Sequence, residues 1–341
     1  MKIRSRAPLR LGIAGGGTDV SPYSDIHGGA VLNATLNLYA KTYIEKSSDN
    51  NSTTFIANDI EIKETINTNK PVCIAGNLML HRAVYKKVME RFNDGNLIPL
   101  IVTTECDAPP GSGLGSSSAI VVSMLEAYRN LLALPLGEYD LAHLAYEIER
   151  KDCGFSGGKQ DQYAATFGGF NFIEFAKNDR VIVNPLRIKN KTIYELESSI
   201  ILFYTGASRE SAKIIDNQIN AIKKGGTSLE AMHHLKESAY RIKEFILKDN
   251  IEKFAEELKI TWLAKKATSS SISNYVIDGI ENSVMNMGAL SVKVSGAGGG
   301  GFIMVITKPE NKSAITKELK KLGGTTVNFN FIKEGAFSWR I

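Results

Sequence analysis

The chain has 341 residues, enough for two packed domains, and its composition of 43% hydrophobic and 23% charged residues is that of an ordinary folded protein. This composition excludes a disordered chain, a collagen and a coiled coil. The balance of 41 basic against 36 acidic residues gives a net charge of +5, so we expect no nucleic-acid partner but a small anionic substrate.

Short β-like runs alternate with longer segments of helical periodicity, so the sequence predicts an α+β protein. In the first half we expect strands at 36–45, 100–105, 171–175 and 180–185, and helices at 80–93, 117–132 and 139–151. In the second half we expect strands at 199–204, 291–295, 302–307 and 325–331, and helices at 208–224, 228–247, 251–267, 274–287 and 310–322. A polar, basic stretch at 176–198 separates the halves, and we place the domains at 1–185 and 186–341.

The cysteines and the uncharged segments bear on the compartment. Cys73, Cys106 and Cys153 show neither a disulfide pattern nor metal-ligand spacing, which fits the reducing cytoplasm. The basic N-terminus lacks the apolar run of a signal peptide, and prolines and glycines interrupt the uncharged stretch 108–125, so we expect no membrane span. The long helices of the second half could support a homodimer, but we expect their apolar faces to fill the core.

The strongest local motif is Pro-Pro-Gly-Ser-Gly-Leu-Gly-Ser-Ser-Ser-Ala at 109–119, between a predicted strand and a predicted helix. Glycines let the backbone turn several N–H groups toward one point, and the helix N-terminus adds further donors, so the motif favours a polyphosphate-binding loop. A hydroxyl from Ser116, Ser117 or Ser118 also suits a magnesium ion bound to the phosphates. The alternative is a turn whose serines only cap the helix. The spacing matches neither a Walker A loop nor a dinucleotide fingerprint.

Two more glycine clusters flank predicted strands. The run 295–301 is longer than a hairpin turn needs, which is typical either of close approach to a ligand or of a flexible hairpin. Near the N-terminus, Arg10 and Asp19 bracket a glycine-rich bend. A carboxylate there suits the hydroxyls of a sugar, and Arg10 suits phosphate or developing negative charge. Alternatively, Thr18 and Asp19 cap a turn and Arg10 is solvated.

Two acidic residues flank a further glycine-containing turn. Glu149 ends a predicted helix, and Asp161 follows in Gly-Lys-Gln-Asp-Gln. If they converge, one carboxylate can hold a metal and the other can orient or deprotonate a hydroxyl. The alternative is that Glu149 is a solvated helix residue and that Asp161 is a helix N-cap. Taken with the loop at 109–119, the pattern favours phosphoryl transfer to an alcohol.

Together these motifs resemble those of the GHMP kinases, the family of galactokinase, homoserine kinase, mevalonate kinase and phosphomevalonate kinase. The resemblance covers essentially the whole chain, through the motifs at 7–19, 109–119 and 293–301 in that order. It implies a two-domain fold, with an N-terminal domain like the second domain of ribosomal protein S5 and a ferredoxin-like C-terminal domain. It also implies a cleft that binds ATP, Mg2+ and an acceptor alcohol.

The resemblance further implies roles for particular residues. Asp161 would orient or deprotonate the acceptor hydroxyl, Arg10 would stabilise negative charge, and Lys159 would be a further cation of the site. Glu149 and Ser117 would hold the metal. The nucleotide loop would consist of Pro110, Gly111, Ser112, Gly113, Leu114, Gly115, Ser116, Ser117 and Ser118. The substrate would meet Gly16, Gly17, Thr18, Asp19, Arg209 and Gly298. The segment 78–82 is a candidate for the adenine pocket.

The first motif narrows the acceptor. Where galactokinases carry Gly-Glu-His-Thr-Asp, this chain has Gly-Gly-Gly-Thr-Asp at 15–19, followed by Val-Ser-Pro-Tyr. That form resembles the motif of kinases acting on D-glycero-D-manno-heptose 7-phosphate and, more distantly, of fucokinases, which implies phosphorylation of the anomeric hydroxyl. A phosphate on the acceptor requires cations, for which Arg10, Lys159, Arg209 and Lys213 are candidates. A kinase for a free hexose, a mevalonate-branch decarboxylase and a non-catalytic sugar sensor are the alternatives.

Overall fold

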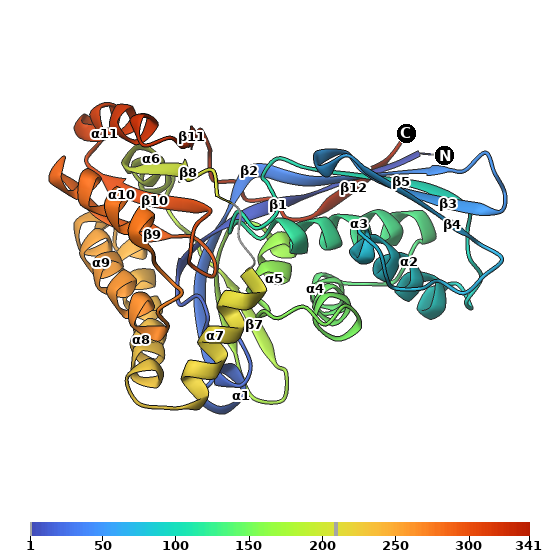
Figure 1. Ribbon diagram of the computed structural model, residues 1–341, viewed down its shortest axis with the longest axis horizontal. Helices are drawn as coiled ribbons and strands as arrows, with labels where there is room; N and C mark the ends of the chain where they lie inside the picture. Colours follow the sequence, from blue (N-terminus) through green and yellow to red (C-terminus); the bar gives the residue numbers. More distant parts are fainter. Residues whose placement is uncertain (1, 208–210) are drawn as a thin grey trace.

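The computed structural model describes residues 2–207 and 211–341. Within these ranges the chain forms two sheets, each covered by helices and lying side by side (Figure 1). The larger has eight strands in the order β12-β1-β2-β5-β3-β4, with β6 beside β2 and β7 beside β6. Its strands are β1 (Lys2–Ala14), β2 (Gly29–Lys46), β3 (Ser52–Ala57), β4 (Ile62–Asn67), β5 (Leu100–Cys106), β6 (Phe170–Phe175), β7 (Val181–Pro185) and β12 (Phe337–Arg340).

Helices cover one face of this sheet because apolar residues recur along one side of each helix. The central one is α3 (Ser116–Leu132), whose Val121, Val122 and Leu125 are fully buried against β1 and β2. Around it lie α2 (Met79–Phe92), α4 (Glu138–Glu147) and α5 (Gln160–Phe167), with the short α1 (Tyr23–His27) at the far end of the sheet. A 3₁₀ turn, Asn58–Ile60, joins β3 to β4.

The smaller sheet has the order β11-β8-β10-β9 and is antiparallel throughout. Numbered within this half of the chain, the strand order is fourth, first, third, second, which is the ferredoxin-like arrangement that we expected. Its strands are β8 (Ile200–Tyr204), β9 (Ala289–Val294), β10 (Phe302–Thr307) and β11 (Thr325–Val327). Its helices are α6 (Asn190–Ser199), α7 (Ser211–Lys223), α8 (Thr227–Leu247), α9 (Ile251–Thr268), α10 (Tyr275–Asn286) and α11 (Pro309–Lys321).

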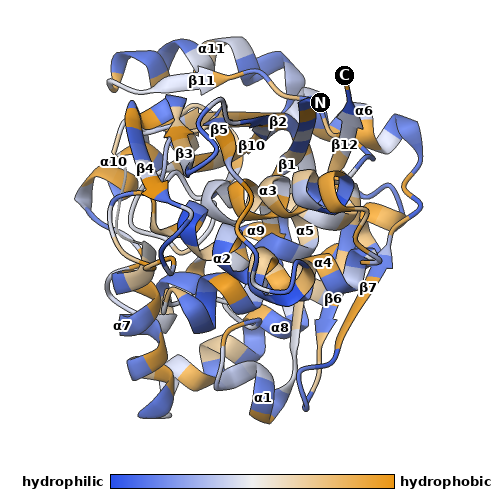
Figure 2. Ribbon diagram, turned by 90° about the vertical axis from the view of Figure 1, so that its right-hand side faces the viewer, coloured by the Kyte–Doolittle hydropathy of each residue, from blue (hydrophilic) through white to orange (hydrophobic). Residues whose placement is uncertain are grey.

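The apolar faces of the long second-half helices fill the core, as expected. Leu235 and Ile242 of α8 and Trp262 of α9 are buried almost completely. Surface helices such as α7 carry hydrophobic and hydrophilic stretches in alternation (Figure 2). In the described part of the chain, no helix is both long and apolar enough to cross a membrane.

Several predicted elements differ from the observed ones. The predicted helix 139–151 ends at Glu147 and continues as a π-helix, Ile148–Asp152. The predicted strand 325–331 pairs only over Thr325–Val327. Strands β1, β3, β4 and β12 and helices α1, α5 and α6 were not predicted. The boundary at 185/186 stays a prediction, and residues 337–340 pair with β1 at the edge of the larger sheet.

Candidate active site

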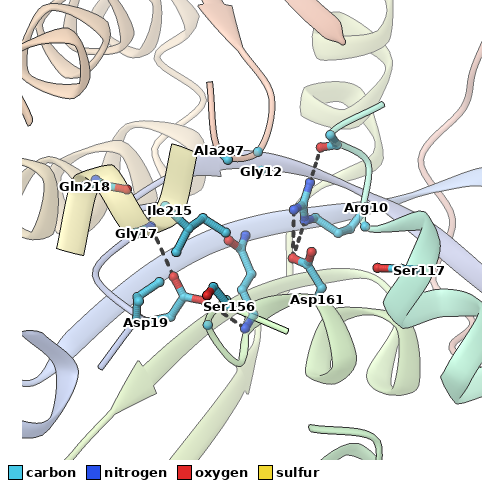
Figure 3. A pocket seen from close by; sticks show the side chains of 18 of the residues that line it. Arg10, Gly12, Gly17, Asp19, Ser117, Ser156, Asp161, Ile215, Gln218 and Ala297 are labelled. Carbon is cyan, nitrogen blue, oxygen red and sulfur yellow. Dashed lines mark hydrogen bonds and ion pairs between the residues drawn. The ribbon is translucent and has the colours of Figure 1, made fainter. Parts of the chain in front are cut away.

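A cleft enclosing about 900 Å3 of empty space, open solvent included, brings residues of both halves together (Figure 3). From the first half come the end of β1, the bend after it, the loop before α3 and the start of α5. From the second half come α7, α9, β9 and the loop at 296–297. The three predicted glycine-rich motifs therefore meet at one place, as the sequence motifs implied.

The loop before α3 has the backbone shape that its glycines permit. Gly111, Gly113 and Gly115 have φ values of 70°, 88° and 75°, a region that side chains with a Cβ rarely adopt. These three glycines line the cleft with Ser116 and Ser117. Gly115 is the N-cap of α3, so the helix directs its first N–H groups toward the cleft. The loop is thus shaped to bind an anion.

Three side chains of the predicted nucleotide loop do not line the cleft. Leu114 is fully buried in the hydrophobic core, and the side chain of Ser112 is likewise buried. Ser118 Oγ donates to Glu149 Oε2 at 2.7 Å inside the protein. Pro110 lines a neighbouring apolar pocket instead.

Arg10 and Asp161 form a partly buried ion pair in the cleft. Arg10 lies on β1 and is 5% exposed, and its Nε and Nη2 lie 2.8 and 2.7 Å from Asp161 Oδ1. Arg10 Nη1 also donates to the carbonyl of Gly113. A Cβ placed on Gly115 would lie 3.3 Å from Asp161 Oδ2, so this oxygen faces the glycine loop. The predicted acid and cation therefore lie together beside the anion-binding loop.

Glu149 and Ser117 converge as predicted. Ser117 Oγ donates to Glu149 Oε1 at 3.3 Å, and Glu149 itself is fully buried on the π-helix. Ser118 and Gln162 both donate to its other oxygen. Within residues 2–207 and 211–341 no group of three or more metal-binding side chains occurs. One carboxylate and one hydroxyl fit magnesium, which takes few protein ligands and completes its shell with phosphate and water oxygens.

The bend after β1 forms the other end of the cleft. Gly16, Gly17 and Asp19 line it, and Asp19 accepts hydrogen bonds from the backbone N–H groups of Gly17 at 3.1 Å and Gln160 at 3.0 Å. Thr18, a predicted substrate residue, does not line the cleft. Its hydroxyl is fully buried and donates to the carbonyl of Gly15, so it holds the shape of the bend rather than facing the cleft.

Two other predicted residues do not line the cleft. Lys159 is buried, pairs with Asp179 on the β6–β7 turn and lies over the ring of Tyr146. Gly298 packs against the backbone of Ile272, and its neighbours at 296–297 line the cleft instead. Arg209 lies outside the described residues.

The cleft also contains residues that the sequence analysis missed. Lys293 of β9 is 5% exposed and donates to the carbonyl of Gly12 at 2.7 Å. Lys265 of α9 and Gln218 of α7 meet the bend at Gly16 and Gly17. Lys293 belongs to the quoted motif at 293–301, so a local signal existed for it. The other two lie on ordinary amphipathic helices without such a signal.

Lys293 makes stability depend on pH. Burial, with the nearby charges of Lys265 and Arg10, lowers the pKa of Lys293 from 10.5 to about 7. Between these values the unfolded chain binds more protons than the folded one, so the free energy of unfolding rises with pH there, and the full burial cost applies below pH ~7. We expect the free energy of unfolding of Lys293→Met, minus that of the natural protein, to be greatest near pH ~6 and to decline toward pH ~10. Urea unfolding of both proteins at several pH values tests this, and a pH-independent difference would contradict it.

Gly301 couples two of the glycine motifs. A Cβ there would lie 2.2 Å from the carbonyl oxygen of Ser112, and its φ is 79°. We expect Gly301→Ala to lower the free energy of unfolding by about 3 kcal/mol or more, because overpacking adds to backbone strain. Gly95→Ala is the matched control, since Gly95 has a φ of 76° and nothing within 4 Å of its Cβ position. Urea unfolding measures both variants, and equal losses would show that the contact carries no energy.

An apolar pocket adjoins the anion-binding loop. It encloses about 810 Å3, open solvent included, and its lining includes Ile60, Leu78, Met79, His81 and Ile120. Burial lowers the pKa of His81 to about 4, so this ring is neutral near pH ~7. Gly111, Ser116 and Ser117 line both this pocket and the cleft. A flat apolar base would fit here with its phosphates on the loop, in line with the candidate segment 78–82.

An anion-binding loop at a helix N-terminus that faces an acid–cation pair is the arrangement that a small-molecule kinase requires. Comparison with known proteins agrees with this class. Residues 79–169 match the GHMP kinases N terminal domain, and residues 242–324 match the GHMP kinases C terminal model. The chain belongs to the GHMP kinase family, as the motifs implied.

Individual relatives support the same family. The chain is 43% identical over 99% of both lengths to a D-glycero-alpha-D-manno-heptose 7-phosphate kinase of Campylobacter jejuni. A crystal structure of a D-glycero-D-manno-heptose 1-phosphate kinase from Bacteroides thetaiotaomicron is 42% identical, with a TM-score of 0.84 over 99% of both chains. Lactococcus lactis galactokinase complexed with galactose has a TM-score of 0.77 over 98% of this chain and 95% of its own, at 15% identity, which shows a shared fold alone.

Proposed function

We propose that the protein transfers the terminal phosphoryl group of ATP to the anomeric hydroxyl of D-glycero-D-manno-heptose 7-phosphate, giving the 1,7-bisphosphate for nucleotide-activated heptose synthesis. The observation that carries the kinase chemistry is the Arg10–Asp161 pair, whose free side faces the glycine loop at Gly115. The heptose acceptor is supported by the full-length similarity to the Campylobacter jejuni enzyme.

Asp161 and Arg10 act on the acceptor hydroxyl. Arg10 holds Asp161 through Oδ1, and Oδ2 lies on the side of the loop where the donor phosphate would bind. A sugar hydroxyl donating to Oδ2 would therefore be aimed at that phosphate, and its proton would pass to Oδ2. Because phosphoryl transfer has a loose transition state, orientation contributes more than early removal of the proton. Arg10 and the loop N–H groups stabilise the negative charge that develops.

Ser117 and Glu149 would hold the magnesium ion. Their oxygens already lie 3.3 Å apart at the N-terminus of α3. When bound, the ion would neutralise charge on the transferred phosphate and its leaving group. The buried hydrogen bonds from Ser118 and Gln162 fix the orientation of the Glu149 carboxylate for that role.

The two heptose kinases that the chain resembles carry names that differ in the position of the acceptor's phosphate, 7 in one and 1 in the other. An ATP-consumption assay with both heptose phosphates, mannose 6-phosphate, fucose, galactose and mevalonate separates the possibilities, with the new phosphate located by phosphorus NMR. Turnover of heptose 7-phosphate with an anomeric phosphate signal is the expected result. Preference for the 1-phosphate, or for an unphosphorylated sugar, would overturn the proposed acceptor.

The proposal also covers the cellular compartment and the oligomeric state of the enzyme. Cys73, Cys106 and Cys153 are free thiols, which fits a reducing compartment, and the reaction consumes ATP, so we place the enzyme in the cytoplasm. A homodimer stays a prediction that sedimentation equilibrium would decide.

A further inference from the structure

We infer that the side-chain amide of Gln160 binds the acceptor sugar, by a hydrogen bond to its 2-hydroxyl, the hydroxyl next to the anomeric one. Gln160 would thus be a specificity-determining residue of the proposed reaction, placed between the acid that meets the reacting hydroxyl and the bend after β1. The inference rests on the proposed function and adds one sugar contact to it.

Gln160 connects the two carboxylates of the cleft. It is the first residue of α5, directly before Asp161, and its backbone N–H donates to Asp19 Oδ2 at 3.0 Å. Figure 3 shows Asp161 with Arg10 on one side of the cleft and Asp19 with Gly17 on the other. Because Gln160 is the chain neighbour of one acid and is hydrogen-bonded to the other, a sugar that extends from Asp161 toward Asp19 passes close to it.

The side-chain NH2 group of Gln160 is buried without a hydrogen-bond partner. Only 5% of the residue is exposed, and Nε2 has no acceptor within residues 2–207 and 211–341. Buried polar groups in folded proteins nearly always have a partner, because an unpaired one has given up its hydrogen bonds to water. Gln160 also lines the cleft. A donor without a partner in a binding cleft indicates that its acceptor arrives with the ligand.

The space beside this donor is open because position 12 is a glycine. A Cβ placed on Gly12 would lie 3.6 Å from Gln160 Nε2 and 3.9 Å from Arg10 Nη1. Apart from Gly12 and its two chain neighbours, no other atom of the described residues lies within 4 Å of that point. A ligand oxygen near this point would accept a hydrogen bond from Gln160, and the positive charge of Arg10 would stabilise its lone pairs.

The 2-hydroxyl of the sugar suits this position best. Arg10 and Asp161 are assigned to the anomeric hydroxyl, so an oxygen beside Arg10 belongs to an atom next to the anomeric carbon. The ring oxygen and the 2-hydroxyl both qualify, but the ring oxygen can only accept a hydrogen bond. The row of hydroxyls that begins at the 2-hydroxyl offers an acceptor for Nε2 and a donor for Oε1. Oε1 lies 3.9 Å from the Cβ position of Gly16, further along the cleft.

The test compares heptose 7-phosphate with its 2-deoxy analogue as acceptors, in the natural protein and in Gln160→Met. Methionine matches glutamine in length but has no N–H donor. We expect the natural protein to use the 2-deoxy analogue with a kcat/KM about 5- to 150-fold lower, the effect of leaving one buried polar group unpaired. Gln160→Met should lose a similar factor with heptose 7-phosphate. In this variant, removal of the 2-hydroxyl should change kcat/KM by no more than about twofold, because the two changes then remove the same contact.

Two further variants accompany this comparison. Gly12→Ala places a methyl group where the ligand oxygen would bind, and Gly12 is outside the left-handed region, so alanine fits its backbone. It should raise the KM for heptose 7-phosphate more than the KM for the 2-deoxy analogue. Asn33→Leu is the matched control, because Asn33 on β2 also has a buried amide without a partner but does not line the cleft. It should keep the preference of the natural protein.

The possible results distinguish this inference from the proposed function. If the natural protein turns over heptose 7-phosphate and Gln160→Met keeps the preference for the 2-hydroxyl, the assigned contact is wrong and the proposed function stands. An equal loss with both acceptors would also overturn the contact, because the amide would then only support the shape of the cleft. If the natural protein uses another sugar, the proposed acceptor fails, and the same comparison with that sugar and its 2-deoxy analogue decides the role of Gln160. Should thermal unfolding show that Gln160→Met does not fold, Gly12→Ala gives the comparison with Gln160 retained.

Discussion

Asp161→Asn should lower kcat by about 100- to 10,000-fold, the range for loss of a positioned acid–base group, while the KM for ATP changes little. Asparagine keeps the volume of the side chain and can still accept a hydrogen bond from Arg10. It cannot take up a proton from the acceptor hydroxyl, and its amide offers only one oxygen where the carboxylate offers two. Steady-state kinetics with the acceptor and with ATP varied in turn measure both parameters.

Asp278→Asn is the matched control for this substitution, because Asp278 lies in the first turn of α10 as Asp161 does in α5, but away from the cleft. Thermal unfolding of both variants separates chemistry from stability. Unchanged turnover in Asp161→Asn would remove Asp161 from the mechanism. A fall in turnover fully explained by unfolded protein would make the Arg10–Asp161 pair structural only.

Glu149→Gln should raise the magnesium concentration needed for half-maximal activity by about 10- to 100-fold or more, in the range seen when the support of a metal ligand is lost. Glu149 is the buried carboxylate at the N-terminus of α3, and an amide oxygen binds a hard dication less strongly than a carboxylate oxygen. Magnesium titrations at fixed total ATP, with the magnesium–ATP complex calculated at each point, measure this change.

Ser117→Ala accompanies this experiment, because it removes the second oxygen without changing a buried charge. It should shift the titration in the same direction by a smaller factor. Identical magnesium titrations for both variants and the natural protein would exclude these two residues from metal binding. A fall in activity at every magnesium concentration, with the midpoint unchanged, would assign Glu149 to holding Ser118 and Gln162 in place.

The predicted fold is accurate where the local pattern and the tertiary structure agree. The helix at 117–132 carries a continuous apolar face, and the strand at 302–307 is buried on both sides, so periodicity and length identified both. Strand β12 is short and exposed, and only its pairing with β1 makes it a strand. The π-helix at Ile148–Asp152 depends on one wider turn, which no apolar period signals.

The site residues likewise fall into those that a local motif predicts and those that only a tertiary contact brings to the cleft. Glycine-rich motifs are local, so the sequence predicted that Arg10, Ser117 and the loop at 111–115 belong to one site, and Arg10, Ser117 and the glycines of this loop line one cleft. Lys265 reaches the bend only because α9 packs beside it, a contact across about 250 positions of the chain. The pairing of Lys159 with Asp179 was not predicted either, because Asp179 lies in a turn without a recognisable motif.

Strand β12 has a consequence for synthesis of the chain. Residues 337–340 complete the edge of the sheet that begins with β1, and Ile3 pairs with Arg340 (Figure 1). The ribosome makes these residues after the whole ferredoxin-like half, so β1 must wait for its outer neighbour while that half emerges and folds. During this interval, which lasts until residues 337–340 have emerged, the exposed edge of β1 can pair with other nascent chains and is open to chaperone binding.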